Sequence, residues 1–257
     1  LHVSNNAGVV IGHTAQVVAG VQGELQVLGA GGDDSGVVIG RFEAGAGHPT
    51  LSMVHARGAI GTFTATIDQD FFGGIEFRGA HTGNAVSPVA AFIKGQQNGA
   101  GSSSRVPGML IFGTGDENNT ATEKARLDEN GSLFLGDTAN GNMTQGLTIN
   151  QGAADNQIFA LRSSDVATGL VDITKGASSH HTTDFFTLQK FSGAVGGAYM
   201  HALADAGAYG MIQETWSKAP TTDNSSASIA QTAYFGGQHD GANADVDMAG
   251  NSNLFSW

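Results

Sequence analysis

The 257-residue chain contains no cysteine, which excludes a disulfide scaffold, a thiolate nucleophile and a cysteine-based zinc site. No apolar run approaches 18 residues, so we expect no transmembrane helix and no membrane insertion. The formal net charge of -12, from 11 basic and 23 acidic residues, argues against a nucleic-acid partner, because binding to the phosphate backbone depends on Lys and Arg.

The chain is short of core-forming residues for its length. Leu, Ile, Val and Phe together make 57 of the 257 residues, and another 39 residues are glycine. Oligomerisation is one remedy for a small core, so we expect a partner chain to supply apolar surface. The sequence starts at Leu1 without an initiator methionine and stops at Trp257 in a strand-like stretch, and we therefore expect a fragment of a longer chain.

Short apolar stretches separated by Gly, Asn and Asp recur from the first residues onward and predict strands joined by turns. Leu1–Val3 leads to Gly-Val-Val-Ile-Gly at 8–12, and Leu25–Val27 leads to the same five residues at 36–40. Residues 127–136 echo this pattern as Leu-Asp-Glu-Asn-Gly-Ser-Leu-Phe-Leu-Gly. Such small units cannot bury both faces alone, whereas stacked or trimerised units can.

The middle of the chain adds two strands and a hairpin to these predictions. Ile75 and Phe77 alternate with polar neighbours at period 2, as in a half-buried strand. The continuous apolar run Met109–Phe112 predicts a strand that is covered on both faces. Asn130-Gly131 predicts a hairpin with a type I′ turn, in which both central residues need positive φ.

A polar, turn-rich joint divides the chain into two predicted domains, 1–141 and 142–257. In the second domain, Phe185–Phe191 alternates between two faces and predicts a strand. Residues Gly197–Ala208 are predicted to form two strands around Asp205–Gly207 rather than a helix, because their glycines disfavour helix.

Several stretches of the first domain, in order along the chain, resemble the modules that recur in tailed-phage tail fibres. The family order is an Arg-Gly strand, a Gly-x-Ile-x-Phe-x-Gly strand, a Met-Pro-Gly-x-Leu-x-Phe strand, and a hairpin of pattern Glu-x-x-Arg-hydrophobic-Asp-x-x-Gly. The matching residues are Ala56–Gly61, Asp68–Asp70, Gly74–Gly79, Ala90–Ile93, Val106–Phe112, Thr122–Asp128 and Gly131–Gly136. Val106 stands where the family has Met. Residues Gly146–Gly152 and Leu161–Ala167 also resemble segments of large phage structural proteins.

The resemblance implies a homotrimeric, non-enzymatic segment of a virion tail appendage, extracellular, with other virion tail proteins as partners. The predicted fold class is all-β, with short strands and hairpins arranged as an elongated trimeric β-prism or β-helix-like fibre, or as small β-sandwich modules. A rigid shaft that supports host attachment is the leading functional hypothesis. A carbohydrate-binding receptor module of a fibre or of an extracellular adhesin filament is the alternative.

Two groups of side chains are candidate ion sites, and no cofactor other than Ca²⁺ or another axial ion is expected. His180, His181 and Asp184 offer imidazole and carboxylate ligands. Adjacent histidines on a strand point to opposite faces, so only one of them can pair easily with Asp184. A polar turn is therefore the alternative to a metal site. Asp68 and Asp70 are predicted on one strand face, where they would share Ca²⁺, act as the acid–base pair of a polysaccharide-cleaving tailspike, or form a solvated turn.

Aromatic and basic side chains supply the remaining candidates. We expect three aromatic residues either to stack on a host-surface glycan or to pack in the core or between chains. They are Trp216, Tyr199 and Tyr209. We expect three of the few cationic side chains to form ion pairs between chains, or to recognise sugars or carboxylates. They are Arg57, Arg78 and Arg126.

Overall fold

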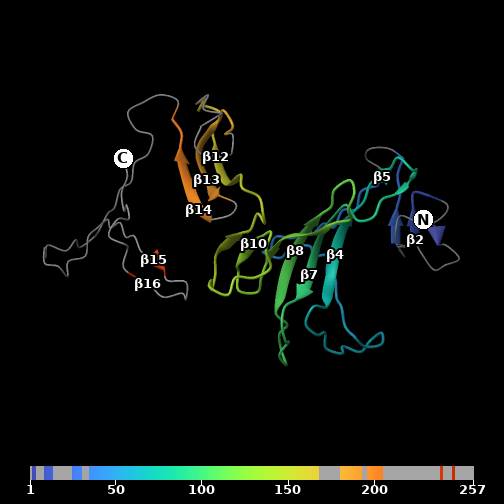
Figure 1. Cartoon of the computed structure of the whole chain (residues 1–257). Helices are drawn as coiled ribbons and strands as arrows, with labels where there is room; N and C mark the ends of the chain where they lie inside the picture. Colours follow the sequence, from blue (N-terminus) through green and yellow to red (C-terminus); the bar gives the residue numbers. More distant parts are fainter. Residues whose placement is uncertain are drawn as a thin grey trace. The chain divides into compact units, whose positions relative to one another are not determined.

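The computed structural model describes residues 2–3, 9–13, 25–30, 35–167, 180–192, 196–204, 238–239 and 245–246 (Figure 1). They belong to two compact units, Leu1–Ala154 and Asp155–Trp257, each of which is described by itself. Regular structure in the described residues consists of strands alone, so the all-β class is confirmed for this part of the chain. No helix in this part is long and apolar enough to cross a membrane.

The first unit begins with a three-stranded sheet in the order β1-β2-β3. Its strands are β1 (His2–Val3), β2 (Val9–Ile11) and β3 (Leu25–Val27). β1 pairs with β2 antiparallel and β3 pairs with β2 in parallel, and Val10 of the central strand is fully buried. The first copy of the repeat therefore forms the predicted pair of strands.

A six-stranded sheet in the order β11-β10-β9-β8-β7-β4 makes up the larger part of this unit, and Figure 1 shows β8, β7 and β4 side by side. All of its pairs are antiparallel except β10 with β11. A short hairpin of β5 (Ala80–His81) and β6 (Ala85–Val86) lies in the connection from β4 to β7. The six strands are β4 (Phe71–Phe77), β7 (Ala91–Gln97), β8 (Gly108–Thr114), β9 (Thr122–Leu127), β10 (Leu133–Leu135) and β11 (Leu147–Ile149).

The predicted hairpin between β9 and β10 is present, but its turn is not of type I′. The backbone N–H of Gly131 donates to the carbonyl of Asp128 at 3.1 Å, and the N–H of Asp128 donates to the carbonyl of Ser132 at 3.0 Å. Gly131 has a φ of +84°, whereas Asn130 keeps a negative φ. The loop is therefore a three-residue one, in which a type I turn is followed by a left-handed glycine.

Strand β8 is covered on one face only within its own chain, contrary to the expectation from its continuous apolar run. Met109 and Ile111 are each 4% exposed, whereas Leu110 and Phe112 on the other face are 39% and 38% exposed. Alternation of side chains along a strand turns one continuous run into two faces. The sequence cannot tell that the second face is left partly exposed by the described residues.

The second copy of the repeat differs from the first. Leu25–Val27 forms β3, but residues 36–40 contain no strand, although they repeat the Gly-Val-Val-Ile-Gly of residues 8–12. Val38 is 91% exposed, so nothing in the described chain covers it. The pattern of five residues is thus insufficient by itself to form a strand.

The second unit contains a three-stranded antiparallel sheet in the order β12-β13-β14. Its strands are β12 (Gln157–Arg162), β13 (Asp184–Ser192) and β14 (Gly196–Ala202), and a further pair is formed by β15 (Gln238–His239) and β16 (Asp245–Val246). β13 and β14 confirm strands at both predicted places. The expected turn at Asp205–Gly207 lies outside the described residues.

The two units divide at Ala154 and Asp155, whereas the sequence pattern placed the division at 141/142. β11 accounts for the difference. It follows the polar joint, but it pairs with β10 in parallel, with Leu133 opposite Leu147. The polar, turn-rich stretch that ends at 141/142 is therefore a loop inside the first unit and not the boundary between the units.

Candidate functional site

One side of the six-stranded sheet, here called the open face, carries two rows of apolar residues that run from edge to edge. In one row Ile75, Ile93, Phe112, Ala125, Leu135 and Ile149 lie opposite one another across all six strands. The next row consists of Gly73, Gly95, Leu110, Leu127, Leu133 and Leu147. Neither row contains a charged or polar side chain. Most of the large side chains in the two rows are exposed, among them Ile75, Leu110, Phe112, Leu127, Leu133, Leu135 and Leu147.

The opposite side of the same sheet combines buried apolar residues with ion pairs. Met109, Ile111 and Phe134 are buried there. The ammonium of Lys94 lies 3.3 Å from Oε1 of Glu76 and 4.4 Å from the centre of the Phe92 ring. The ion pair of Lys94 and Glu76 thus lies on the side opposite the two apolar rows. The open face is therefore the larger exposed apolar surface of this sheet.

An apolar groove of about 360 Å³ lies on the open face near its β4 edge. Met53 forms one wall, so close to β4 that a Cβ added to Gly73 would lie 2.6 Å from the Cβ of Met53. The residues that line the groove are Leu51, Met53, Phe72, Gly73, Gly74, Ile75, Ile93, Gly95 and Leu110.

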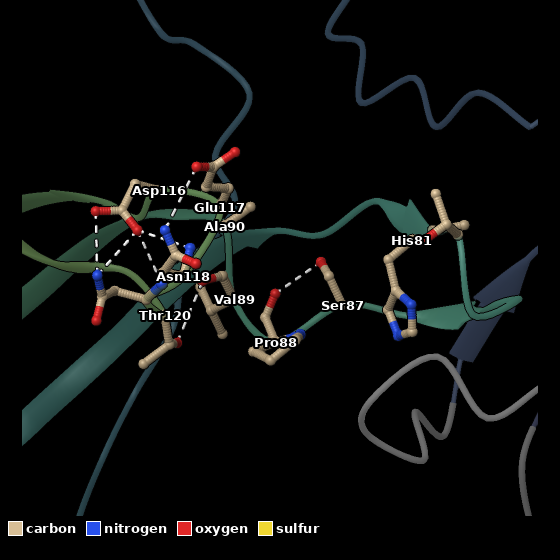
Figure 2. Close-up of a pocket in the computed structure, with 12 residues that line it drawn as sticks. His81, Ser87, Pro88, Val89, Ala90, Asp116, Glu117, Asn118 and Thr120 are labelled. Atoms are coloured by element: carbon tan, nitrogen blue, oxygen red, sulfur yellow. Dashed lines mark hydrogen bonds between the residues drawn. The ribbon is translucent and has the colours of Figure 1, made fainter.

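A second cavity, of about 550 Å³, lies where the β4–β7 and β8–β9 connections meet at one end of the sheet (Figure 2). Figure 2 shows Asp116 and Asn118 on one side of it and His81 on the other. Asp116 Oδ1 accepts hydrogen bonds from the backbone N–H groups of Asn118 and Asn119, each at 2.9 Å, and these bonds lower the pKa of Asp116. Pro88, Val89 and Ala90 contribute apolar surface. The sequence gives no sign of this cavity, because loops far apart in the chain form it.

Asp68 and Asp70 do not share a strand face, and this expectation was wrong. They flank Gln69, which has a φ of +71° in a turn before β4. Asp68 Oδ1 accepts the N–H of Gly99 at 2.6 Å. Asp70 accepts Nε and Nη2 of Arg57 at 2.6 and 2.7 Å. Each carboxylate thus has separate structural partners.

His180 and Asp184 lie in one polar cluster of the second unit, but the cluster has the character of a turn. Asp184 is fully buried and accepts Nε of Arg162 at 2.6 Å and the N–H of His181 at 2.8 Å. Burial raises the pKa of Asp184, but hydrogen bonds from His181, Arg162 and Gln157 outweigh it, and the pKa lies below its usual value. The exposed ring of His181 contacts Thr183 instead.

No group of three or more His, Cys, Asp or Glu side chains that could hold a metal ion occurs in the part of the chain that the structure describes. The candidate ligands Asp68, Asp70, His180, His181 and Asp184 are all in that part. The structure thus places them in turns and hydrogen-bonded pairs and brings no three of them together as a ligand set.

The aromatic candidates are only partly within the described residues. Tyr199 on β14 is half-buried between Phe191 and His201, with ring centroids 4.9 and 5.2 Å away. The structure thus favours packing for this tyrosine. Tyr209 and Trp216 lie outside the described residues.

The three arginines expected to pair between chains have partners within their own chain. Arg57 pairs with Asp70, and Nη2 of Arg78 donates to Glu76 at 2.8 Å. Nη2 of Arg126 donates to Glu123 at 2.7 Å. A count of cations could not reveal this, because the partners depend on strand register and on the turn before β4.

No protein-family model and no curated protein matches this chain. Among solved structures, the carboxy-terminal domain of the bacteriophage T5 L-shaped tail fibre is similar, with 15% identity and a TM-score of 0.39, over 86% of this chain and 94% of that one. The same domain with its intramolecular chaperone domain has 14% identity and a TM-score of 0.39, over 86% of this chain and 64% of that one. At these values the likeness does not by itself define the fold or role of the chain.

Proposed function

We propose that this chain is a rigid, non-enzymatic segment of a phage tail fibre or related virion appendage, in which three copies associate through their open faces. The open face is the observation that carries the proposal, because two full rows of apolar residues cross the sheet and most of their large side chains are exposed in the described part of the chain. The ordered tail-fibre motifs supply the virion location, the tail-protein partners and the number of copies. The geometry of one chain supplies the surface that the copies share.

The energetics favour association. Twenty-eight large hydrophobic side chains of the described residues are exposed, against five hydrophobic ones that are buried. Burial of apolar surface contributes about 25 cal/mol per Å², so that covering half of a Leu or Phe side chain contributes on the order of 1 kcal/mol. Seven such side chains contribute on the order of 7 kcal/mol per copy, which is comparable to the cost of association. A covered face also removes a surface prone to aggregation.

The association is tested by light scattering on the intact chain and on two variants of adjacent residues in β8. Phe112→Asp places a charge on the open face and should convert a three-chain species into a folded single chain. Ile111→Asp, the matched control, buries an unpaired charge on the covered face and should destabilise the fold by roughly 3 kcal/mol or more. A wild-type chain that is monomeric and well folded at micromolar concentration would contradict the proposal.

A carbohydrate-binding receptor module is the second candidate function, and the cavity in Figure 2 favours it. The cavity combines amide, carboxylate and imidazole groups with apolar surface, a composition typical of small-ligand sites. A glycan array with the wild-type chain, Asn119→Ala and Trp216→Ala would locate the binding surface. Binding lost only in Asn119→Ala assigns the cavity, loss only in Trp216→Ala assigns the second unit, and no binding removes this function.

The absence of enzymatic activity is part of the proposal, and the positions of Asp68 and Asp70 support it. Asp70 is neutralised by Arg57, and Asp68 is bonded to Gly99. Incubation with capsular polysaccharide should release no reducing ends. Release that disappears in Asp68→Asn would establish a polysaccharide-cleaving activity instead.

A further inference from the structure

Three asparagines of this chain are followed directly by glycine, and all three lie in the described part. They are Asn98, Asn130 and Asn140. An asparagine before glycine can lose its side-chain amide without an enzyme, when the backbone nitrogen of the glycine attacks the amide carbon. Glycine hinders this attack least, because it has no side chain. The folded structure decides which of the three reacts, because the two reacting atoms must be free to meet.

The attacking nitrogen is engaged in a hydrogen bond at two of the three sites. The N–H of Gly99 donates to Oδ1 of Asp68 at 2.6 Å. The N–H of Gly131 donates to the carbonyl of Asp128 at 3.1 Å. The nitrogen attacks after it has lost its proton, and an anionic nitrogen at Gly99 would face the carboxylate of Asp68. Both hydrogen bonds therefore keep the proton on the nitrogen and slow the attack.

The third glycine, Gly141, differs from the other two. Its N–H makes no hydrogen bond to any residue in the part of the chain that the structure describes. Gly141 is exposed, and a Cβ added to it would have no atom within 4 Å. The peptide bond between Asn140 and Gly141 thus has room to rotate, and its nitrogen is open to lose a proton to solvent.

The side chain of Asn140 is folded across its own glycine. Oδ1 of Asn140 accepts the N–H of Asn142 at 3.1 Å, so the side-chain amide lies over the peptide bond to Gly141. The same hydrogen bond draws electron density from the amide carbon and makes this carbon more electrophilic. Nucleophile and electrophile are therefore close together before the reaction starts, which lowers its entropic cost.

The side chains of Asn98 and Asn130 are held by another residue. Nδ2 of each donates to the carboxylate of Glu129. Rotation toward the glycine would break a hydrogen bond to a charged acceptor, which is stronger than one to a neutral acceptor. Asn150 makes the same forward hydrogen bond as Asn140, with the N–H two residues on at 2.9 Å, but the residue that follows it is Gln151, whose side chain hinders the attack.

We propose that Asn140 is a site of spontaneous deamidation and isomerisation. The nitrogen of Gly141 gives its proton to a hydroxide ion and bonds to the side-chain carbonyl carbon of Asn140. The bond from this carbon to Nδ2 breaks, and Nδ2 takes up a proton from water and leaves as ammonia. Water then opens the cyclic imide at either carbonyl and gives aspartate or isoaspartate. Both products lose the hydrogen bond of 3.0 Å from Nδ2 to Oγ1 of Thr148 on β11, and isoaspartate also adds one methylene to the main chain.

Peptide mapping by mass spectrometry tests the site in the intact chain, folded in buffer or unfolded in concentrated urea, at about pH 8.5. In urea the three Asn-Gly pairs should react at similar rates. Folding should slow Asn98 and Asn130 at least tenfold and Asn140 less than threefold. Gly141→Ala should slow Asn140 at least tenfold and leave the other two sites unchanged. Equal slowing of all three by folding, or a faster reaction at Asn98 or Asn130 in the folded chain, would overturn the proposal.

Hydrogen exchange tests the consequence for the sheet, and it does not depend on the proposed function. β11 is joined to β10 through the N–H of Asn150, which donates to the carbonyl of Leu135 at 2.8 Å. Chains aged to isoaspartate should exchange their β11 amides at least tenfold faster than fresh chains. Asn140→Asp is the matched control, because it adds the charge without the methylene, and should stay within threefold of the fresh chain. Equal exchange in aged and fresh chains would overturn this consequence.

Discussion

The carboxylate of Asp70 is held by three donors from the first unit. Nε and Nη2 of Arg57 approach its two oxygens, and the N–H of Ile67 donates to Oδ2 at 3.0 Å. The hydrogen bond from Arg57 holds the pKa of Asp70 well below its usual range. Both side chains were candidates for intermolecular or catalytic roles from sequence. The turn at Gln69 decided otherwise, because it aims Asp70 at its own chain.

This pair predicts a specific loss of stability in acid. A carboxyl with a pKa lowered by folding stabilises the native state above its unfolded pKa, near 4, and loses that contribution as pH falls below it. The thermal midpoint of the wild-type chain should therefore fall between pH 5 and pH 2 more than that of Asp70→Asn. Arg57→Gln should behave like Asp70→Asn. Equal acid dependence in wild type and both variants would show that the pair contributes nothing.

His180 is buried next to His201, with ring centroids 4.9 Å apart. Its Nδ1 contacts Nε2 of Gln157 at 2.9 Å, and its Nε2 has no hydrogen-bond partner among the described residues. Burial lowers the pKa of His180, the neighbouring His201 lowers it further, and Asp184 partly offsets both. The imidazole is thus held neutral by its surroundings.

Acidification below about pH 6.5 should therefore destabilise the second unit. The unfolded chain binds a proton at His180 more readily than the folded chain, so stability falls as pH drops through the unfolded pKa. Hydrogen exchange of β13 amides should accelerate between pH 7 and pH 5, after correction for the intrinsic pH effect. His180→Gln should reduce this acceleration. His181→Gln, on the exposed neighbour, should leave it unchanged.

At the scale of elements, the glycines that follow β2 and β10 allow the next parallel strand to approach closely. A Cβ added at Gly136 would lie 2.1 Å from the carbonyl oxygen of Asn150, and one added at Gly12 would lie 1.9 Å from that of Leu28. Both positions also require a positive φ, which side chains disfavour. The parallel strand therefore approaches the turn as closely as it does only because glycine has no side chain.

Alanine substitutions separate conformation from close approach. Gly152 has a φ of +64° with nothing near its added Cβ, so Gly152→Ala should cost about 1 kcal/mol from backbone strain alone. Gly136→Ala adds the clash with Asn150 and should cost more than about 2 kcal/mol. Urea unfolding of the two variants compares these costs. Equal losses of stability in the two variants would mean that the connection between β10 and β11 relaxes to relieve the clash at Gly136.

Period-2 alternation predicted most strands correctly, because it depends on the direction of successive side chains and on little else. β4 and β13 lie where alternation placed them, and β8 lies where the continuous apolar run placed it. The repeat did not predict correctly at residues 36–40, where a strand needs a neighbour to pair with. The turn type predicted from Asn130-Gly131 was wrong, because it depends on the φ of a single residue, Asn130.

At the scale of the whole molecule, charge opposes association while the open face favours it. Each copy carries a formal charge of -12, and the two apolar rows of the open face carry none. Like charges at the periphery repel over a Debye length of about 10 Å at 0.1 M salt. In the proposed assembly, the balance between these two terms sets the concentration at which copies separate.

Salt should therefore strengthen the assembly. Between 50 mM and 500 mM NaCl the dissociation concentration should fall several-fold, because repulsion is screened while apolar burial persists. Analytical ultracentrifugation at both salt concentrations measures the change. The opposite trend would indicate that ion pairs between copies hold the assembly, in conflict with the pairing of Arg57, Arg78 and Arg126 inside one chain.

Composition and spacing were enough to predict an all-β chain with a small core and a repeated strand unit. These properties follow from side-chain volume and alternation, which are local. The tertiary structure decided which faces are covered, that the candidate carboxylates and arginines are partners within one chain, and that two distant loops enclose a cavity. It had to decide them, because register and turn geometry bring together residues whose distance along the chain says nothing of their distance in space.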